Sequence, residues 1–584
     1  MSFLLDVSII GGGLTGTAML WQCIRQAQKV SDKNPWFPSR IRIRIFEKRK
    51  KFGPGFPHNQ DNVLPFHITN MYASDMGIFP ENPGDFQSWI ARNQSRLMDR
   101  FGWFKRFMGQ QDDSVCYHYP RAIMGEYLKT RFLQAVQLAR QLGISVELHA
   151  CTEVEGIQPD AGGFRLSCRN LATGEQVSMK TAQVLIATGH WQKESLDAFF
   201  FSCPWPAQKL QQEIPKGEKV AVIGTSLSAI ETLLTLTSED RFVRSESGDL
   251  GYLPPEKTRT FCLYSRKGLL PKVRGRTGSY RNHFFRPKIL ARMWTDKTRN
   301  RSLVALFELL DADLQTAYDR PFDWNEIKNP SGTPETVLSE SIKDALEGDS
   351  HQGDVLWQTI LLQGLSVAKE MYLNLTLRQR KIFDDQYTSV FFTHAATQPV
   401  INAEKLLALI RAGIVEIKSL GTSYQLLKDE QGSRYVFLYK NRHGHDKKEA
   451  YSYVVNARGQ DKSILTDKSL LIQSMVASGM VLTEESRPAA NVKDPWGSAD
   501  TGRYKTGSIW INPDTHQVMQ RDPGGQFMPS ESLYAVGAMT RGQIINASMA
   551  QSIVRSVSKV AEHLFGKVIP VSGRKDQQIG RYII

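Results

Sequence analysis

Cysteine is scarce in this sequence, and its spacing argues against two familiar kinds of site. Six cysteines occur among 584 residues, and no two of them form a C-x-x-C pair. A dithiol redox centre or a zinc ribbon would need such pairs, so neither is predicted and no metal site is expected. Buried thiols in a reducing compartment fit this pattern, which favours a cytoplasmic location.

Long apolar runs are also missing. No stretch stays apolar over the ~18–20 residues that a membrane span needs. The first 23 residues are largely apolar, but they carry Asp6, contain four glycines and lack a basic start. They therefore predict a strand, a turn and a helix rather than a signal peptide, and no membrane span is expected.

Charge is plentiful but is not concentrated. The formal net charge is +14, yet no run of five or more like charges occurs. A basic surface attracts phosphate-bearing partners, which include dinucleotides, nucleic acids and anionic membranes. The stripes of basic and aromatic residues that are typical of nucleic-acid readers are absent, so no nucleic-acid partner is expected. A solvated basic face with a few contacts to a cofactor explains the charge.

A glycine pattern near the N-terminus is the most informative motif. It is G-x-G-x-x-G, formed by Gly11, Gly13 and Gly16, with Leu14 and Thr15 in its variable positions. An apolar strand precedes it and a helix follows it. Glycines here permit a tight turn and a close approach of the backbone to a pyrophosphate, which then faces the N–H groups of the helix. This is the predicted FAD site.

A second strand, over residues 40–47, completes the unit. It alternates basic and apolar side chains and ends on Glu47, which is placed to accept hydrogen bonds from ribose hydroxyls. The distance from Gly16 exceeds the usual ~20 residues, and a loop insertion at 31–39 explains the excess.

Two later apolar strands also end on small residues, which can lie beside a cofactor without clashing. One ends at Thr188 and Gly189, and the other ends at Gly537 and leads to Arg541. The chain is therefore expected to return to the FAD site near its C-terminus.

A weaker copy of the glycine pattern occurs in the middle of the chain. A strand over 219–223 leads into G-x-S-x-x-A, in which Gly224, Ser226 and Ala229 take the three glycine positions. Serine and alanine are small enough to keep the packing close. A structural α/β unit without a ligand is the alternative interpretation, because the third glycine is replaced.

The strand after this second pattern ends on basic residues. Where the first unit has an acid, residues 260–264 lead into Ser265 and Arg266. An arginine at this position can bind the 2′-phosphate of a nucleotide, so NADPH is favoured over NADH.

These motifs together resemble those of bacterial FAD/NAD(P)-binding proteins with two dinucleotide sites, which are related to class B flavin monooxygenases and N-hydroxylating monooxygenases. The resemblance spans most of the chain, and its blocks follow the family's order. The blocks are 11–16, 52–55, 70–73, 82–89, 119–121, 125–128, 187–190, 224–231, 265–271, and 537 with 541–542.

The resemblance implies contacts to the flavin from two polar residues in these blocks. They are Asn70 and Arg121, although capping of a helix or a turn would explain each equally well. No catalytic residue is assigned, because the cofactors would carry the chemistry. Arg458 departs from the family pattern: a bulky cation stands where a small-residue turn is usual, which would alter a second flavin contact.

The expected fold class is α/β, with two Rossmann-like dinucleotide-binding domains. The FAD-binding domain is expected to be discontinuous, at 1–205 and 441–584, and the NAD(P)-binding domain is expected at 206–285 and 391–440. A helical insertion at 286–390 is expected to shape substrate access. Its aromatic residues either line an apolar pocket or belong to an ordinary helical core; they include Trp324, Trp357 and Tyr372.

The favoured function is an FAD-dependent oxidoreductase that uses NADPH, and more specifically a monooxygenase acting on a small molecule. Two alternatives stay open. One is an FAD-binding protein without turnover that serves as a redox-responsive interaction module, which the departures at Arg458 and Ala229 would suit. The other is a flavoenzyme acting on RNA, prompted by the positive charge. The substrate, the electron acceptor and the oligomeric state stay open, as does whether the second nucleotide site is functional.

Overall fold

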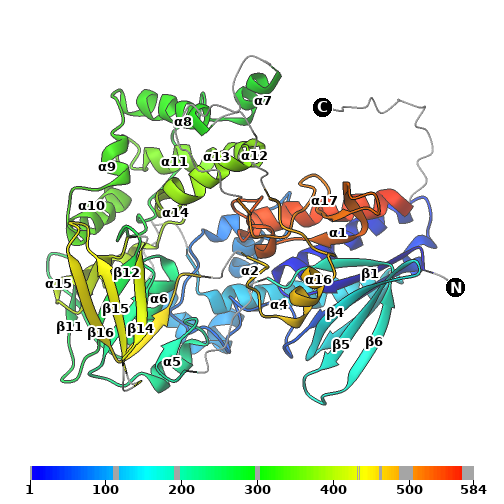
Figure 1. Ribbon diagram of the computed structural model, residues 1–584, viewed down its shortest axis with the longest axis horizontal. Helices are drawn as coiled ribbons and strands as arrows, with labels where there is room; N and C mark the ends of the chain where they lie inside the picture. The colour runs from blue at the N-terminus through cyan, green and yellow to red at the C-terminus, as the bar shows by residue number, and fades with distance from the viewer. Residues whose placement is uncertain are drawn as a thin grey trace.

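The chain folds into two α/β units and a group of helices beside them (Figure 1). The computed structural model describes residues 3–109, 118–189, 197–295, 303–421, 423–429, 432, 434–459, 463–485 and 504–568.

The first unit is built on a six-stranded sheet with the order β18-β19-β7-β1-β2-β3. Four parallel neighbours form its centre: β1 (Leu5–Ile10), β2 (Ile41–Glu47), β3 (Ser145–Ala150) and β7 (Gln183–Ile186). Two strands come from the C-terminal region: β18 (Gln517–Arg521) and β19 (Phe527–Ala535). Because β19 pairs in parallel with β7, the unit is discontinuous in sequence.

The second unit repeats this order in a five-stranded sheet, β13-β12-β9-β17-β8. Its strands are parallel: β8 (Phe200–Phe201), β9 (Lys219–Ile223), β12 (Thr260–Ser265), β13 (Val415–Ser419) and β17 (Tyr453–Asn456). The strands β17, β9, β12 and β13 take the places of β7, β1, β2 and β3. The two units therefore share one topology.

Helices cover one face of each parallel sheet. They are α1 (Leu14–Ser31), α4 (Arg121–Gln141) and α17 (Ala550–Val568) in the first unit, and α6 (Leu227–Leu236) and α15 (Val400–Arg411) in the second. In Figure 1, α17 and α1 lie side by side.

A three-stranded antiparallel sheet packs on the other face of each unit. In the first unit it consists of β4 (Thr152–Asp160), β5 (Gly163–Asn170) and β6 (Gln176–Thr181), and in the second of β14 (Tyr424–Lys428), β15 (Tyr435–Lys440) and β16 (Asp446–Tyr451). The layers therefore repeat as well as the strand order.

The sequence of β2 explains its burial. Ile41, Ile43 and Ile45 alternate with other residues and are fully buried on the helix side of the sheet. Arg44 between them is buried too, and its guanidinium donates to Asp6 at 2.9 Å and to Glu147 at 3.1 Å. Paired in this way, a charged side chain is tolerated inside the sheet.

A group of helices occupies the chain between β12 and α15, and we call it the helical segment. Its members are α7 (Pro287–Thr295), α8 (Leu303–Tyr318), α9 (Trp324–Lys328), α10 (Pro334–Glu347), α11 (Leu356–Gln363), α12 (Leu365–Asn374), α13 (Leu377–Ile382), the π-helical turn η3 (Phe383–Tyr387) and α14 (Thr388–Ala395). The segment appears in green in the upper left of Figure 1. Much of it packs around an apolar core of its own.

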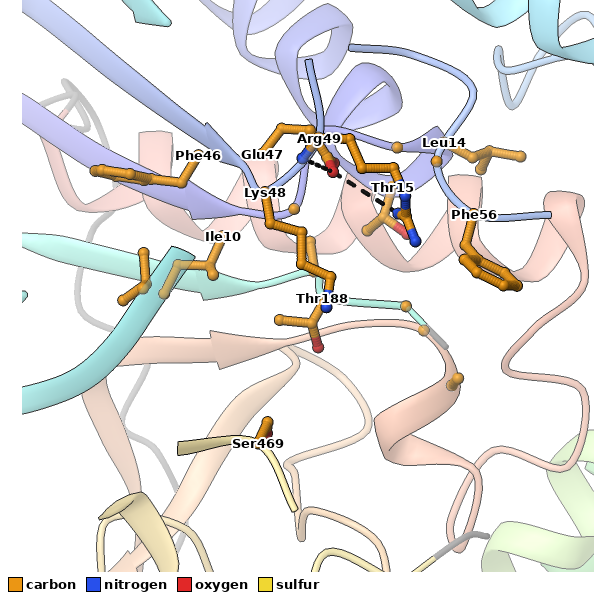
Figure 2. Close-up of a pocket in the computed structure, with 18 of the residues that line it drawn as sticks. Ile10, Leu14, Thr15, Phe46, Glu47, Lys48, Arg49, Phe56, Thr188 and Ser469 are labelled. Carbon is orange, nitrogen blue, oxygen red and sulfur yellow. Dashed lines mark hydrogen bonds and ion pairs between the residues drawn. The ribbon is translucent and has the colours of Figure 1, made fainter. Parts of the chain in front are cut away.

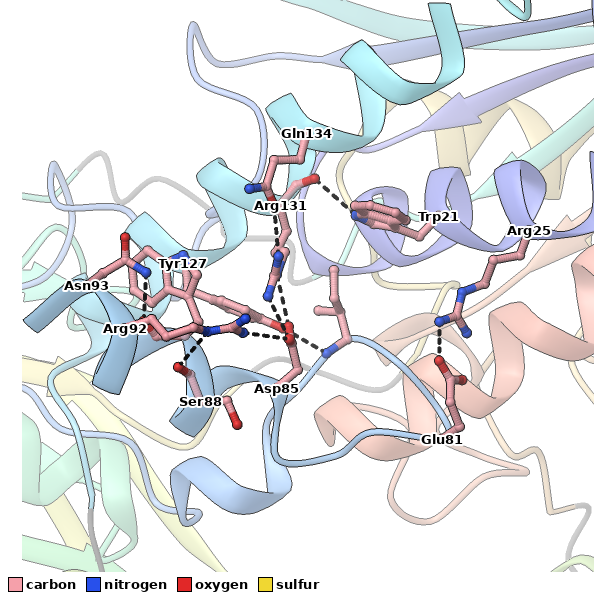
Figure 3. Close-up of polar contacts among 12 residues, drawn as sticks. Trp21, Arg25, Glu81, Asp85, Ser88, Arg92, Asn93, Tyr127, Arg131 and Gln134 are labelled. Carbon is pink, nitrogen blue, oxygen red and sulfur yellow. Dashed lines mark hydrogen bonds and ion pairs between the residues drawn. The ribbon is translucent and has the colours of Figure 1, made fainter. Parts of the chain in front are cut away.

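The corresponding stretch of the first unit, between β2 and α4, holds α2 (Asp85–Arg100) and α3 (Gly102–Met108). A buried carboxylate fixes it (Figure 3). Asp85 accepts hydrogen bonds from Tyr127 Oη at 2.6 Å and from Arg131 Nε and Nη2 at 2.9 and 2.6 Å. The backbone N–H of Ile78 donates to the same Tyr127 hydroxyl. The start of α2 is thereby tied to α4.

The predicted fold class is confirmed, but the sheets place two strands outside the expected NAD(P) domain. β8 comes before residue 206 and β17 comes after residue 440, yet both pair within the second sheet. The boundaries at 205 and 441 are therefore corrected: the second unit begins ahead of β8 and ends after β17. The physical reason is that β17 is the counterpart of β7 and completes the sheet beside β9.

None of the five described cysteines forms a disulfide, and Cys116 lies outside the described residues. Within the part of the chain that the structure describes, no helix combines the length and the apolar character that crossing a membrane requires.

Candidate nucleotide sites and the cavities between them

The first cavity lies at the carboxyl ends of β1, β2 and β7 (Figure 2). Its volume is about 180 Å³. Leu14 and Thr15 begin α1 at its wall, and the N-cap residue Gly13 offers no side chain to the first N–H groups of the helix. The N-terminus of α1 therefore turns N–H groups and the positive end of the helix dipole toward the cavity, an arrangement that binds a pyrophosphate.

Close contacts explain two of the three glycines of the loop. A Cβ atom at Gly11 would lie 2.2 Å from the carbonyl oxygen of Ala187, and Gly11 has a φ of 118°. A Cβ atom at Gly16 would lie 2.3 Å from the carbonyl oxygen of Gly11. These two residues keep the turn tight and α1 close to the sheet. A Cβ atom at Gly13 would lie 3.1 Å from the Cα of Gly55, which is also tight, and Gly13 lines the cavity.

Glu47 ends β2 beside this loop and is buried. Its Oε2 accepts a hydrogen bond from the N–H of Gly12 at 3.0 Å, and its Oε1 accepts one from the N–H of Arg49 at 3.0 Å. Each oxygen retains a lone pair for a ribose hydroxyl. Lys48 and Arg49 line the same cavity and add positive charge (Figure 2).

Most of the predicted contact residues line one of two cavities. The wall of the first cavity includes Gly11, Gly13, Leu14, Thr15, Glu47, Thr188, Gly189 and Gly537. The wall of a second, larger cavity includes Asn70, Arg121, Ser226 and Arg541. The remaining four line neither cavity: Gly16, Gly224, Ser265 and Arg266.

The second unit repeats the geometry of the glycine loop. Gly224 has a φ of 131°, and a Cβ atom there would lie 2.9 Å from the carbonyl oxygen of Ala457. Gly224 thus lies against the carbonyl group of Ala457 in the same way as Gly11 lies against that of Ala187. Ser226 is the N-cap of α6 and, like Gly13, makes no capping hydrogen bond with its side chain. The start of α6 is thus also suited to a phosphate.

Ser265 replaces Glu47 at the end of the second strand. Its Oγ accepts hydrogen bonds from Thr225 Oγ1 at 3.0 Å and from the N–H of Gly268 at 2.9 Å. The neighbouring Arg266 is exposed, and its Nη2 donates to Ser389 Oγ of α14 at 2.9 Å. Ser265 thus braces the loop, while Arg266 presents its guanidinium at the surface.

The second cavity has a volume of about 1200 Å³ and lies between the two units and the helical segment. It shares five wall residues with the first cavity: Leu14, Phe56, Pro57, His58 and Ser548. At its other end it reaches the start of α6 through Ser226, Leu227 and Ser228. The two cavities therefore adjoin at these five residues, between the two predicted nucleotide sites.

Two contacts with α6 hold the units together beside this cavity. Arg121, the first residue of α4, pairs in a bidentate manner with Glu231 of α6. One turn further along α6, the hydroxyl of Thr235 lies 2.9 Å from Nε2 of the buried His67, whose Nδ1 accepts from the N–H of Leu64. Burial and the charge of Arg121 lower the pKa of His67 to about 3, so its imidazole is neutral.

The helical segment reaches the second cavity through residues that differ from the predicted ones. Trp324, Trp357 and Tyr372 are not among the residues that line it; Tyr372 is buried within the segment. The lining residues are Leu365, Phe391, Phe392, Ala395 and Ala396. Their signal in the sequence is the pair of adjacent phenylalanines at the end of the segment, just before the chain returns to the second unit.

The structure also changes the interpretation of Arg458. It follows β17, in the second unit, so it takes no part in the sheet of the first unit. Its guanidinium donates to Asn456 Oδ1 and to Tyr424 Oη, and it lines the second cavity. Residues 453–459 thus belong to the second unit, and the expected effect of Arg458 on a second flavin contact stays a prediction.

Comparison with known proteins gives one family and several distant similarities. Residues 8–191 match the family described as FAD-NAD(P)-binding. The uncharacterized protein YdhS of Escherichia coli K12 is 22% identical over 489 residues, which cover 78% of this chain and 83% of that protein.

Solved structures are similar at low sequence identity. Reduced ornithine hydroxylase PvdA from Pseudomonas aeruginosa has 12% identity and a TM-score of 0.49, over 96% of this chain and 99% of that one. FAD-bound DfoA, the cadaverine monooxygenase of desferrioxamine biosynthesis in Erwinia amylovora, has 10% identity and a TM-score of 0.49, over 100% and 99%. The family match spans the glycine loop and Glu47, and it confirms the prediction of an FAD/NAD(P)-binding protein.

Proposed function

We propose that the protein is an FAD-dependent oxidoreductase that takes electrons from NADPH, and that it is a monooxygenase acting on a small molecule. The observation that carries this proposal is the pair of adjoining cavities. The wall of the first includes the N-terminus of α1 and the wall of the second includes that of α6, and each of these termini suits a dinucleotide phosphate. Bound at these two sites, FAD and NADPH would occupy neighbouring cavities.

The first cavity fits FAD. Its backbone cradle at Gly13 and Gly55 is bare of side chains, so a pyrophosphate can approach the start of α1. Glu47 would hold the ribose, and the N–H groups of Leu14 and Thr15 would hold the pyrophosphate. FAD is longer than this cavity, so its flavin end would extend past Phe56 and His58 into the second. When bound, FAD supplies the hydride acceptor and the electrons that activate oxygen.

The residues at the start of α6 would bind NADPH. Gly224 and Ser226 leave the helix N-terminus open to the nucleotide phosphates. Arg266, at the end of β12, would bind the 2′-phosphate. The nicotinamide of a nucleotide held there would point toward the second cavity, whose wall includes Ser226.

The wall of the second cavity contributes by excluding water. Leu365, Phe391 and Phe392 of the helical segment line it together with Ile545 and Met549 of the first unit. An apolar enclosure strengthens electrostatic interactions and limits loss of reactive oxygen species to solvent. The helical segment thus serves substrate binding rather than cofactor binding.

Rapid mixing tests the proposal. Under anaerobic conditions NADPH is expected to bleach the flavin absorbance of the purified protein faster than NADH does, and oxygen is expected to restore it with consumption of one O₂ per NADPH. Gly224→Asp should keep its FAD and remain reducible by dithionite, yet lose reduction by NADPH, because its Cβ atom would lie 2.9 Å from the carbonyl oxygen of Ala457 and displace the loop from the phosphate site.

Gly248→Asp is the matched control, since Gly248 lies in the same unit with no atom within 4 Å of its Cβ position. Unchanged reduction of Gly224→Asp by NADPH would contradict the assignment of the second site. Absence of flavin from the wild-type protein would contradict the whole proposal.

A further inference from the structure

The charges on the wall of the second cavity are strongly unequal. Among the described residues that line it, five are basic and one is acidic; they are Arg121, Arg274, Arg458, Lys468 and Arg541, against Glu231. Arg121 and Glu231 neutralise each other through their bidentate pair. The excess of basic over acidic residues gives this wall a net positive charge, which attracts anions and repels amines.

Arg541 stands out among these cations. It is half-buried, and its guanidinium lies over the ring of Phe392 at 5.1 Å. Within the described part of the chain, this guanidinium makes no hydrogen bond and no ion pair. The acid whose charge reaches it, Asp384, already accepts hydrogen bonds from Tyr504 Oη at 2.7 Å and Tyr372 Oη at 3.3 Å.

Such a cation is unsatisfied in the protein alone. Burial lowers the pKa of Arg541 from its ordinary value, yet a guanidinium stays protonated in proteins. Taking a charge out of water without a partner is unfavourable, and an anionic group of a ligand would relieve that penalty through two parallel N–H···O bonds.

The surroundings of Arg541 indicate what the rest of the ligand is. Leu365 and Phe391 of the helical segment, with Ile545 and Met549 of the first unit, give this part of the cavity an apolar wall. A ligand that fits here carries its negative charge at one end and an apolar body beside it. The phosphates of NADPH have their own site at α6, on the other unit, so Arg541 is not required for them.

We propose that the substrate is a carboxylate with an apolar body, and that Arg541 binds the carboxylate. This assigns Arg541 to the substrate rather than to FAD. The assignment of a substrate rests on the proposed oxidoreductase function, but binding itself is measured without turnover and without NADPH.

Three ligands with the same phenylbutyl skeleton test the inference: 4-phenylbutyrate, its neutral amide 4-phenylbutyramide of the same shape, and the cation 4-phenylbutylamine. Isothermal titration of the FAD-loaded protein is expected to rank them acid, amide, amine, with the acid bound at least tenfold more tightly than the amine. Arg541→Gln should lower the affinity for the acid at least tenfold, leave the affinity for the amide within twofold of the wild-type value and keep the full FAD content. Arg555→Gln, an exposed arginine outside both cavities, is the matched control.

Several outcomes would overturn the inference. One is failure of the acid to bind, and another is equal binding of acid and amine. Both are measured on the wild-type protein, so they can be tested even if Arg541→Gln folds poorly. A third is complete displacement of 4-phenylbutyrate by NADP⁺, which would assign the cations to the nucleotide. Loss of FAD from folded Arg541→Gln would indicate that Arg541 binds the flavin instead of the substrate. If NADPH fails to reduce the flavin while the acid still binds through Arg541, the proposed function fails and the ligand site stands.

Discussion

The guanidinium of Arg121 donates two hydrogen bonds to the carboxylate of Glu231, from Nε to Oε1 at 2.7 Å and from Nη2 to Oε2 at 3.2 Å. Each residue sits at the cavity-facing edge of its own unit, and Glu231 is almost completely buried. The pair therefore links α4 of the first unit to α6 of the second.

Removal of one partner from this pair should be costly. Glu231→Leu leaves the Arg121 charge half-buried without a counter-ion, and we expect a loss of about 3 kcal/mol in the free energy of unfolding. The double variant Arg121→Met/Glu231→Leu should recover most of that loss, because no unpaired charge remains. Urea unfolding followed by tryptophan fluorescence measures both. Additive losses in the double variant would show that the pair is not a unit.

Acid should weaken the same interface through His67. Its pKa is lowered to about 3 in the folded protein by burial and by Arg121, against 6.5 for the free side chain. The unfolded chain therefore binds a proton that the folded chain does not, so the stability is complete above pH 6.5 and falls as the pH drops toward 3, by up to about 1.4 kcal/mol per pH unit.

The change in the unfolding midpoint between pH 7 and pH 5 measures this dependence. His67→Gln should make it smaller, whereas His443→Gln, on an exposed turn, should leave it as in the wild type. The same pH dependence in wild type and His67→Gln would rule out this histidine as a source.

Adding a single methyl group to the glycine loop, by Gly11→Ala, should sharply reduce FAD binding. Gly11→Ala would place a Cβ atom 2.2 Å from a backbone oxygen at a φ that alanine rarely adopts, so the loop must move away from the pyrophosphate site. We expect less than a tenth of the wild-type flavin absorbance per protein. Gly162→Ala has a φ of 76° but no neighbour within 4 Å, so it should retain FAD. Equal flavin content in the two variants would mean that the loop does not cradle the cofactor.

Selectivity for NADPH should depend on Arg266. A charge-assisted contact with the 2′-phosphate contributes about 1.5–3 kcal/mol of binding free energy. Arg266→Ala is therefore expected to lower the affinity for NADPH by roughly one to two decades and to leave the affinity for NADH nearly unchanged. The rates of flavin reduction at varied nucleotide concentration give both affinities. Arg241→Ala, another exposed arginine of the second unit, serves as the reference. Parallel losses for NADPH and NADH would refute contact with the 2′-phosphate.

Local patterns in the sequence were sufficient to predict the first unit. Its glycine loop, the alternating strand over 41–47 and the terminal Glu47 are consecutive along the chain, and the structure places all three around one cavity. The fold class followed from the same patterns, because a parallel strand–helix–strand unit needs a sheet covered by helices.

The limits of the second unit could not be found in this way, since they depend on pairing between distant strands. β17 lies more than 200 residues from its neighbour β9, and no local signal states which sheet it joins. A comparison of the two units would have helped: 183–189 and 453–459 both run from apolar residues to a glycine of positive φ. The ion pair of Arg121 with Glu231 was equally hidden, because each residue only meets the other once the units dock.

The duplicated topology has a mechanical consequence. Each unit carries a long excursion between its second strand and its returning helix, and each excursion docks on the opposite unit: His67 of the first reaches Thr235, and Arg380 of the helical segment reaches Glu484 at 2.8 Å. The two units are thus held together by contacts from both excursions. Rotation of one unit against the other would have to break both contacts. If the proposed function holds, nucleotides and substrate are therefore expected to enter by local opening of an excursion rather than by rotation of one unit against the other.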